Sequence, residues 1–128
     1  MEAVIYLDTH VVAWLFAGRL DLFPSAARAR LEAERLLVSP MVGLELQYLF
    51  EIGRVTQPAV EVLAALEAEL TLATCELAFP AIALRARDEG WTRDPFDRII
   101  VAQAKLRPAP LLTRDETIHA HYAHAVWP

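Results

Sequence analysis

The feature that most constrains the fold of this chain is an alternation between short apolar segments and longer amphipathic ones. Apolar runs rich in Val, Ile and Leu end at Leu7 and recur at residues 36–38 and 109–113. Between them, longer stretches repeat apolar residues at helical spacing and interleave charged ones. Strands that alternate with helices form βαβ units, in which parallel strands are covered by helices on both faces. The sequence therefore predicts an α/β fold with a mostly parallel central sheet.

Turn and capping residues set the boundaries of the predicted elements. The predicted strands are residues 1–7, 36–38, 70–74, 109–113 and 125–127. The predicted helices are residues 11–16, 26–36, 40–53, 56–69, 79–89, 95–107 and 116–122. Ser39-Pro40 and Asp94-Pro95 predict helix N-termini, because Ser and Asp cap backbone N–H groups and proline fits the first helical position.

Two of these helices have an apolar face that we expect in the core. The expected core positions are Val60, Leu63, Ala64 and Leu66 in helix 56–69, and Phe96, Ile99, Ile100 and Ala104 in helix 95–107.

Length and composition predict one globular domain over residues 1–128, because 55% of the residues are hydrophobic and 23% are charged. The first apolar stretch contains Asp8 and His10 and has no basic lead. It is therefore predicted to be neither a signal peptide nor a membrane span, and we expect a cytoplasmic protein with no membrane contact. Cys75 is the only cysteine, which excludes an internal disulfide, and we expect it to fill space in the core.

The net charge of −5 argues against binding nucleic acid through a general basic surface. Acidic residues that gather around a divalent metal ion would reverse the local field and make a phosphate group welcome. Charge alone therefore does not exclude a nucleic-acid substrate.

Acidic residues follow the predicted strands at positions where parallel strands deliver their carboxyl ends. Asp8 follows the first strand, and Glu45 lies on the helix after the second. Asp94 and Asp97 stand at the head of helix 95–107, and Asp115 follows strand 109–113. Because ligands collect in the crevice at this edge of a parallel sheet, four elements could aim carboxylates at one place.

Converging carboxylates repel one another unless cations or protons neutralise them, so such a cluster predicts bound metal. Mg²⁺ or Mn²⁺ prefers oxygen ligands and can activate a water molecule while screening the charge of a phosphodiester. Phosphodiester hydrolysis is the reaction class that this chemistry best supports.

Four segments, in order along the chain, resemble the motifs of PIN-domain ribonucleases, in particular the VapC toxins of toxin-antitoxin pairs. They are Leu7–Leu15, Val42–Leu46, Arg93–Ala104 with its Asp-Pro-Phe-Asp-Arg run, and Leu111–Asp115. The resemblance implies an α/β/α sandwich with divalent-metal-dependent endoribonuclease activity on RNA. It further implies a homodimer that is inhibited by a cognate antitoxin.

The same resemblance implies roles for single residues. Asp8, Glu45 and Asp97 correspond to metal-binding catalytic acids, and Asp115 to a fourth acid whose register is open because Glu116 follows it. Further residues are weaker candidates. Thr113 could assist by hydrogen bonding, Arg98 and Arg114 could hold RNA phosphates, and Asp94 is a less favoured alternative to Asp97.

Each acid also has a purely structural interpretation. Asp8, Asp94 and Asp115 could cap helices, and Asp97 could simply favour the positive end of a helix. Glu45 could pair with an arginine or occupy a half-exposed edge position, and the acids beside Arg98 and Arg114 could form local ion pairs with them.

Two other function classes compete with the nuclease. A catalytically silent PIN-fold module that binds a protein partner would not need the acids. A domain with an aspartyl-phosphate intermediate expects a second acid two residues after the first, where this chain has His10.

Overall fold

The computed structural model describes residues 3–128, which form a parallel sheet covered by helices. The strand β1 (Val4–Leu7) lies at the centre between β2 (Arg35–Val38) and β4 (Leu111–Leu112). The edge strands are β3 (Ala73–Thr74) and β5 (Ala125–Val126). All strand pairings among the described residues are parallel, so the predicted α/β class is confirmed.

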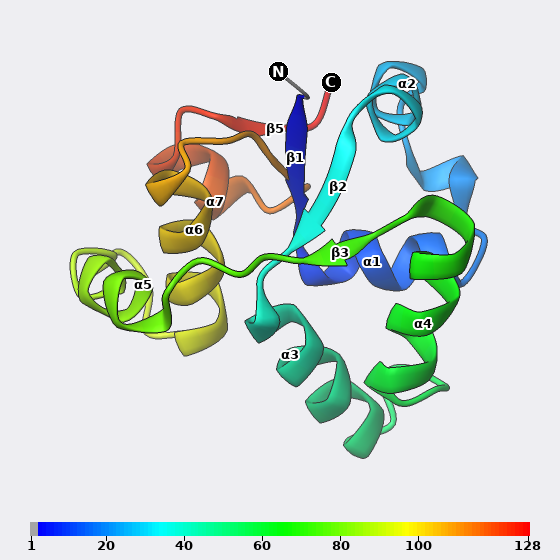
Figure 1. Cartoon of the computed structure of the whole chain (residues 1–128), viewed down its shortest axis with the longest axis horizontal. Coiled ribbons are helices and arrows are strands. Elements are labelled where there is room, and N and C mark those ends of the chain that lie inside the picture. The colour runs from blue at the N-terminus through cyan, green and yellow to red at the C-terminus, as the bar shows by residue number, and fades with distance from the viewer. Residues whose placement is uncertain (1–2) are drawn as a thin grey trace.

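Helices lie on both sides of the strands, as a sandwich requires. They are α1 (Thr9–Phe16), α2 (Ser25–Ala33), α3 (Pro40–Glu51), α4 (Ala59–Leu70), α5 (Phe79–Ala86), α6 (Pro95–Leu106) and α7 (Glu116–His121), with a short 3₁₀ turn, η1, at Leu20–Leu22. Figure 1 shows α5 and α6 on one side of the strands and α2 and α4 on the other. In the same view α3 lies beyond the carboxyl ends of β1 and β2. Among residues 3–128, no helix is long and apolar enough to cross a membrane.

Several predicted boundaries were wrong by a few residues. The predicted strand 70–74 shrinks to its last two positions, because Leu70 ends α4 and Thr71 adopts a left-handed conformation with φ 57°. The predicted helix 26–36 ends at Ala33 because the residues after it join β2, and helix 79–89 ends at Ala86. The predicted start of the first strand at Met1 lies outside the described residues.

The core face of α4 was predicted only in part. Of the expected positions, Leu66 is buried and Leu63 packs half-buried against the core, whereas Val60 is 73% exposed and Ala64 is exposed. Ala59 and Val62 are buried as well. The helix carries apolar residues on more than one face, so its periodicity identified the buried side incompletely. Contacts with α1 and α3 decide it, and Gly43 of α3 allows a close approach, because a Cβ there would lie 3.3 Å from Leu63.

The prediction for α6 was closer. Ile100 and Ala104 are buried, while Phe96 and Ile99 are half-buried. The helix therefore packs through the face that its sequence indicated.

Truncation of two valines on α4 tests this register. We expect Val62→Ala to lower the free energy of unfolding by about 2 kcal/mol, because it removes buried methyl groups. Val60→Ala should change it by less than about 0.5 kcal/mol, because that side chain lies in water. Urea denaturation followed by circular dichroism measures both, and equal effects would contradict the observed register.

Candidate active site

The predicted acids meet in one cleft at the carboxyl ends of the central strands. The cleft has a volume of about 220 Å³ and is lined by Asp8, Thr9, His10, Glu45, Leu49, Asp94, Asp97 and Asp115. The fold therefore brings together side chains from the residue after β1, from α1 and α3, from the N-terminal end of α6 and from the segment after β4.

Asp8 is the most firmly held of these acids. It follows β1, is 4% exposed, and accepts a hydrogen bond from the backbone N–H of Thr9 at 2.8 Å. The hydroxyl of Thr113 donates to its other oxygen at 2.7 Å. Thr113 also accepts from the backbone N–H of Asp115 at 3.1 Å and is fully buried. The predicted hydrogen-bonding residue Thr113 therefore ties Asp8 to Asp115 and has no surface left for a substrate.

Glu45 reaches the cleft from the middle of α3 and is half-buried. Burial raises the pKa of its carboxyl, the hydrogen bond donated by the Thr9 hydroxyl lowers it, and Asp8 and Asp94 raise it further. No arginine of the described chain forms an ion pair with Glu45, so the alternative of a structural salt bridge is not realised.

Asp97 is the acid of the cleft whose pKa is raised most strongly. Burial, followed by the charges of Asp8, Asp94, Asp115 and Glu45, raises the pKa of its carboxyl to about 7. Neighbouring carboxylates act in this way because each disfavours the charged form of the next. A bound cation or a proton would reduce the repulsion between Asp97 and the neighbouring carboxylates.

Asp94 and Asp115 combine the two interpretations that the sequence left open. Asp94 caps α6 by accepting from the N–H of Phe96 at 2.8 Å and, at 3.4 Å, from that of Asp97. Asp115 caps α7 by accepting from the N–H of Thr117 at 2.8 Å and that of Ile118 at 3.2 Å. Both also line the cleft, so capping fixes their position without removing them from it.

His10 is a part of the site that the sequence analysis did not single out. Its Nδ1 lies 3.5 Å from Asp8, and its Nε2 accepts from the backbone N–H of Arg114 at 3.0 Å. Burial lowers the pKa of the imidazole, although Asp8 and Asp115 raise it and Arg114 lowers it again. The only sequence signal was its place in the first turn after Asp8.

Comparison with known proteins agrees with this arrangement. The family model described as PIN domain matches residues 5–124. The chain belongs to the PIN domain family. Ribonuclease VapC22 of Mycobacterium tuberculosis (strain ATCC 25618 / H37Rv) is 32% identical over 122 residues, which cover 91% of each chain.

Solved structures share the PIN fold at lower identity. A toxin-antitoxin complex from Klebsiella pneumoniae matches with a TM-score of 0.65 and 20% identity over 95% of both chains. The crystal structure of VapBC2 from Rickettsia felis, which is bound to a DNA fragment from its promoter, is a second match. It has a TM-score of 0.62 and 15% identity, and the match covers 91% of this chain and 92% of that one. These matches support the sandwich architecture.

The two arginine candidates of this PIN domain do not line the cleft. The Nε of Arg98 donates to the backbone carbonyl of Thr92 at 2.8 Å, and Arg114 is exposed beside the site. Within residues 3–128, neither forms an ion pair, so the alternative of a local salt bridge is not realised for them.

The carboxylates of the cleft are the kind of ligand that a hard divalent cation binds. Their spacing in the described chain, however, does not form a metal site as it stands. Carboxylate oxygens are the ligands that Mg²⁺ and Mn²⁺ prefer. Over residues 3–128, however, no three Asp, Glu, His or Cys side chains are grouped closely enough to hold an ion.

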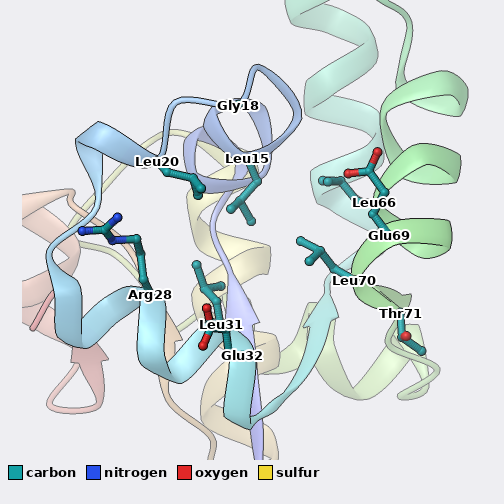
Figure 2. Close-up of a pocket in the computed structure, with 10 residues that line it drawn as sticks. All are labelled: Leu15, Gly18, Leu20, Arg28, Leu31, Glu32, Leu66, Glu69, Leu70 and Thr71. Atoms are coloured by element: carbon teal, nitrogen blue, oxygen red, sulfur yellow. The ribbon is translucent and has the colours of Figure 1, made fainter.

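A larger cavity, of about 550 Å³, lies between α1, α2 and α4 and contains none of the predicted site residues. Figure 2 shows leucine side chains from these helices around it, with Arg28, Glu32 and Glu69 among the polar residues. The smaller cleft is the candidate active site, because groups with perturbed pKa values gather there.

Removal of the Asp97 charge tests the repulsion directly. An acid whose pKa is raised on folding destabilises the fold progressively as the pH rises from its unfolded value toward about 7. With EDTA present at about pH 8, we expect Asp97→Asn to raise Tm by roughly 3 °C or more, the shift that about 1 kcal/mol produces. The gain should shrink near pH 4, where the wild-type carboxyl is protonated in the folded state.

A matched control is Asp88→Asn, which removes the same charge from an exposed position outside the cleft. Asp97 also lies in the first turn of α6, where its charge favours the helix dipole. A lower Tm for Asp97→Asn would mean that this favourable term outweighs the repulsion.

Proposed function

We propose that this PIN domain is a divalent-metal-dependent endoribonuclease that hydrolyses RNA phosphodiester bonds. The observation that carries the proposal is the convergence of Asp8, Glu45, Asp97 and Asp115 in one cleft, where burial and repulsion raise the pKa of Asp97 to about 7. Membership of the PIN family and 32% identity to a protein named ribonuclease VapC22 support the reaction class.

The metal ligands we propose are Asp8, Glu45 and Asp97, with Asp115 as the fourth acid and Asp94 as the alternative third. Rotation of these side chains is required, because no three of them are grouped closely enough among residues 3–128. Mg²⁺ or Mn²⁺ bound there would activate a water molecule and neutralise charge that develops on the phosphate.

The neighbouring residues of the chain would position these acids. Thr113 holds one oxygen of Asp8, and Thr9 holds Glu45 from the first turn of α1. Arg114 is exposed beside the cleft and forms no ion pair among the described residues, so its guanidinium is available to an RNA phosphate. Arg98 is a weaker candidate, because its Nε already donates to a carbonyl.

We further propose that the chain, as one domain over residues 1–128, is the toxin of a toxin-antitoxin pair and acts on cytoplasmic RNA. Its likeness to VapC22 and to the fold of toxin-antitoxin complexes supports a cognate antitoxin as partner. A homodimer is supported by exposed apolar residues spaced four apart, namely Leu44 and Tyr48 on α3 and Ile52, the residue that follows its C-terminal end.

The alternative is a catalytically silent PIN module that binds a protein partner. The observation that favours it is the separation of the acids, since no three described side chains form a ready metal site. Metal titration separates the two functions.

Cleavage of a mixed RNA pool by the purified protein tests the nuclease. We expect cleavage with Mn²⁺, none with EDTA, and a loss of at least about 100-fold for Asp8→Asn, because a metal contributes several kcal/mol to the transition state. Asp21→Asn is the control, because Asp21 is an exposed acid paired with Arg19 on the surface.

Undiminished cleavage with EDTA or by Asp8→Asn would refute the metal mechanism. If the wild type cleaves no RNA and calorimetry detects no Mn²⁺ binding, the silent module becomes the better description.

Charge placed at the C-terminal end of α3 tests the homodimer. We expect Ile52→Arg to weaken dimerisation at least about tenfold, because it buries a charge in an apolar interface. Val60→Arg, on the exposed face of α4, should leave it unchanged. Sedimentation equilibrium measures both, and wild-type dimerisation by Ile52→Arg would place the interface elsewhere.

A further inference from the structure

His10 joins two of the segments that carry the acids of the cleft. It lies in the first turn of α1, directly after the segment of Asp8, and it lines the cleft. Its Nε2 accepts a hydrogen bond at 3.0 Å from the backbone N–H of Arg114, which is 104 positions away in the sequence. Arg114 immediately precedes Asp115, so this bond holds the backbone directly before the fourth acid.

The hydrogen bond from Arg114 also fixes the tautomer of the ring. A ring nitrogen that accepts from an N–H carries no proton, so Nδ1 is the protonated nitrogen of a neutral imidazole. Nδ1 lies 3.5 Å from Oδ2 of Asp8, which is longer than a normal hydrogen bond but within reach of electrostatic attraction. The two ring nitrogens therefore contact two different segments of the site.

Aromatic packing sets the orientation of the ring. Trp14 lies one turn later in α1 and contacts the imidazole edge to face, with ring centroids 4.8 Å apart. Trp14 is itself packed against Phe23 and Trp127, at centroid distances of 6.1 and 5.9 Å. A side chain supported in this way holds its hydrogen-bond partner in one position, because little of its own freedom remains to be lost.

The position of Asp115 depends on two successive hydrogen bonds of the backbone before it. The N–H of Arg114 donates to His10, and the N–H of Asp115 donates to the hydroxyl of Thr113 at 3.1 Å. That hydroxyl in turn donates to Asp8. Arg114 is exposed, so without His10 its N–H would face water and the segment would lose its bond to α1. His10 and Thr113 thus hold Asp115 against Asp8 from two sides.

We propose that His10 is a positioning residue of the nuclease site, which sets the place of Asp115 relative to Asp8 by holding the backbone of Arg114. This role rests on the proposed nuclease function. Because no three acids are grouped closely among residues 3–128, the position of each acid decides whether the set can bind one cation. Residues that hold metal ligands without touching the ion contribute roughly 10- to 100-fold to metal affinity or activity.

Two substitutions in the full chain separate the two ring nitrogens. In His10→Gln the amide oxygen can take the place of Nε2 and accept from Arg114, whereas the shorter side chain of His10→Asn keeps an N–H near the place of Nδ1 and does not reach Arg114. We expect His10→Asn to lower kcat for RNA cleavage and the calorimetric affinity for Mn²⁺ at least about tenfold. His10→Gln should retain both within about threefold, because it keeps the bond to Arg114.

The KM for RNA should change less than about twofold in both variants, because neither removes a group that contacts the substrate. His124→Asn is the matched control, since His124 is exposed and does not line the cleft. Thermal melts check that each variant is folded.

Hydrogen exchange of the metal-free protein, followed by NMR, observes the same bond without any activity. The amide of Arg114 should exchange at least about threefold faster in His10→Asn than in the wild type, because its acceptor is gone. In His10→Gln it should stay protected.

The outcomes separate this role from the nuclease function. Wild-type kcat and Mn²⁺ affinity in His10→Asn would overturn the positioning role and leave the nuclease in place. Equal losses in the two variants would overturn it if the amide of Arg114 stays protected in His10→Gln, and would support it if that amide exchanges fast there. A wild type that neither binds Mn²⁺ nor cleaves RNA would refute the nuclease itself, and exchange at Arg114 would then decide whether His10 holds the segment.

Discussion

Carboxylates that share a cleft repel one another, and this chain gathers five of them in one cleft. Four of the five are held by hydrogen bonds from backbone and hydroxyl groups of the chain. The parallel sheet brings these acids together, because β1 and β4 run in the same direction and Asp8 and Asp115 follow them at the same edge. The cost is seen in the pKa of Asp97, which burial and neighbouring charge raise to about 7. A cleft arranged in this way is stabilised by a cation, and the proposed activity follows from that requirement.

Capping and chemistry use the same side chains in this fold. Asp8, Asp94 and Asp115 each accept hydrogen bonds from the first N–H groups of a helix and still line the cleft. The helix N-termini partly compensate their negative charge, because they carry the positive end of the helix dipole. The structural and functional interpretations of these acids are therefore complementary.

The strand β1 and the helix α6 serve both the acidic cleft and a cluster of Tyr6, Cys75 and Arg107. β1 presents Tyr6 to Cys75 and ends next to Asp8. α6 carries Asp97 in its first turn and is followed by Arg107, which donates to Tyr6 and to the sulfur of Cys75. The cleft is lined by acids, whereas the cluster contains a thiol next to an arginine.

The sequence alone determined the α/β class, the helix caps at Ser39 and Asp94, and the acids that would meet, because periodicity, capping and strand-end position are local properties. It placed the core face of α4 only in part and made the strand before Cys75 too long, because apolar residues lie on several faces there and contacts with neighbouring elements decide which are buried. Thr9 and His10 gave no signal beyond their place directly after Asp8. Only tertiary structure decided their contacts, because each hydrogen-bonds to a residue far along the chain, which the folded sheet and its helices bring within reach.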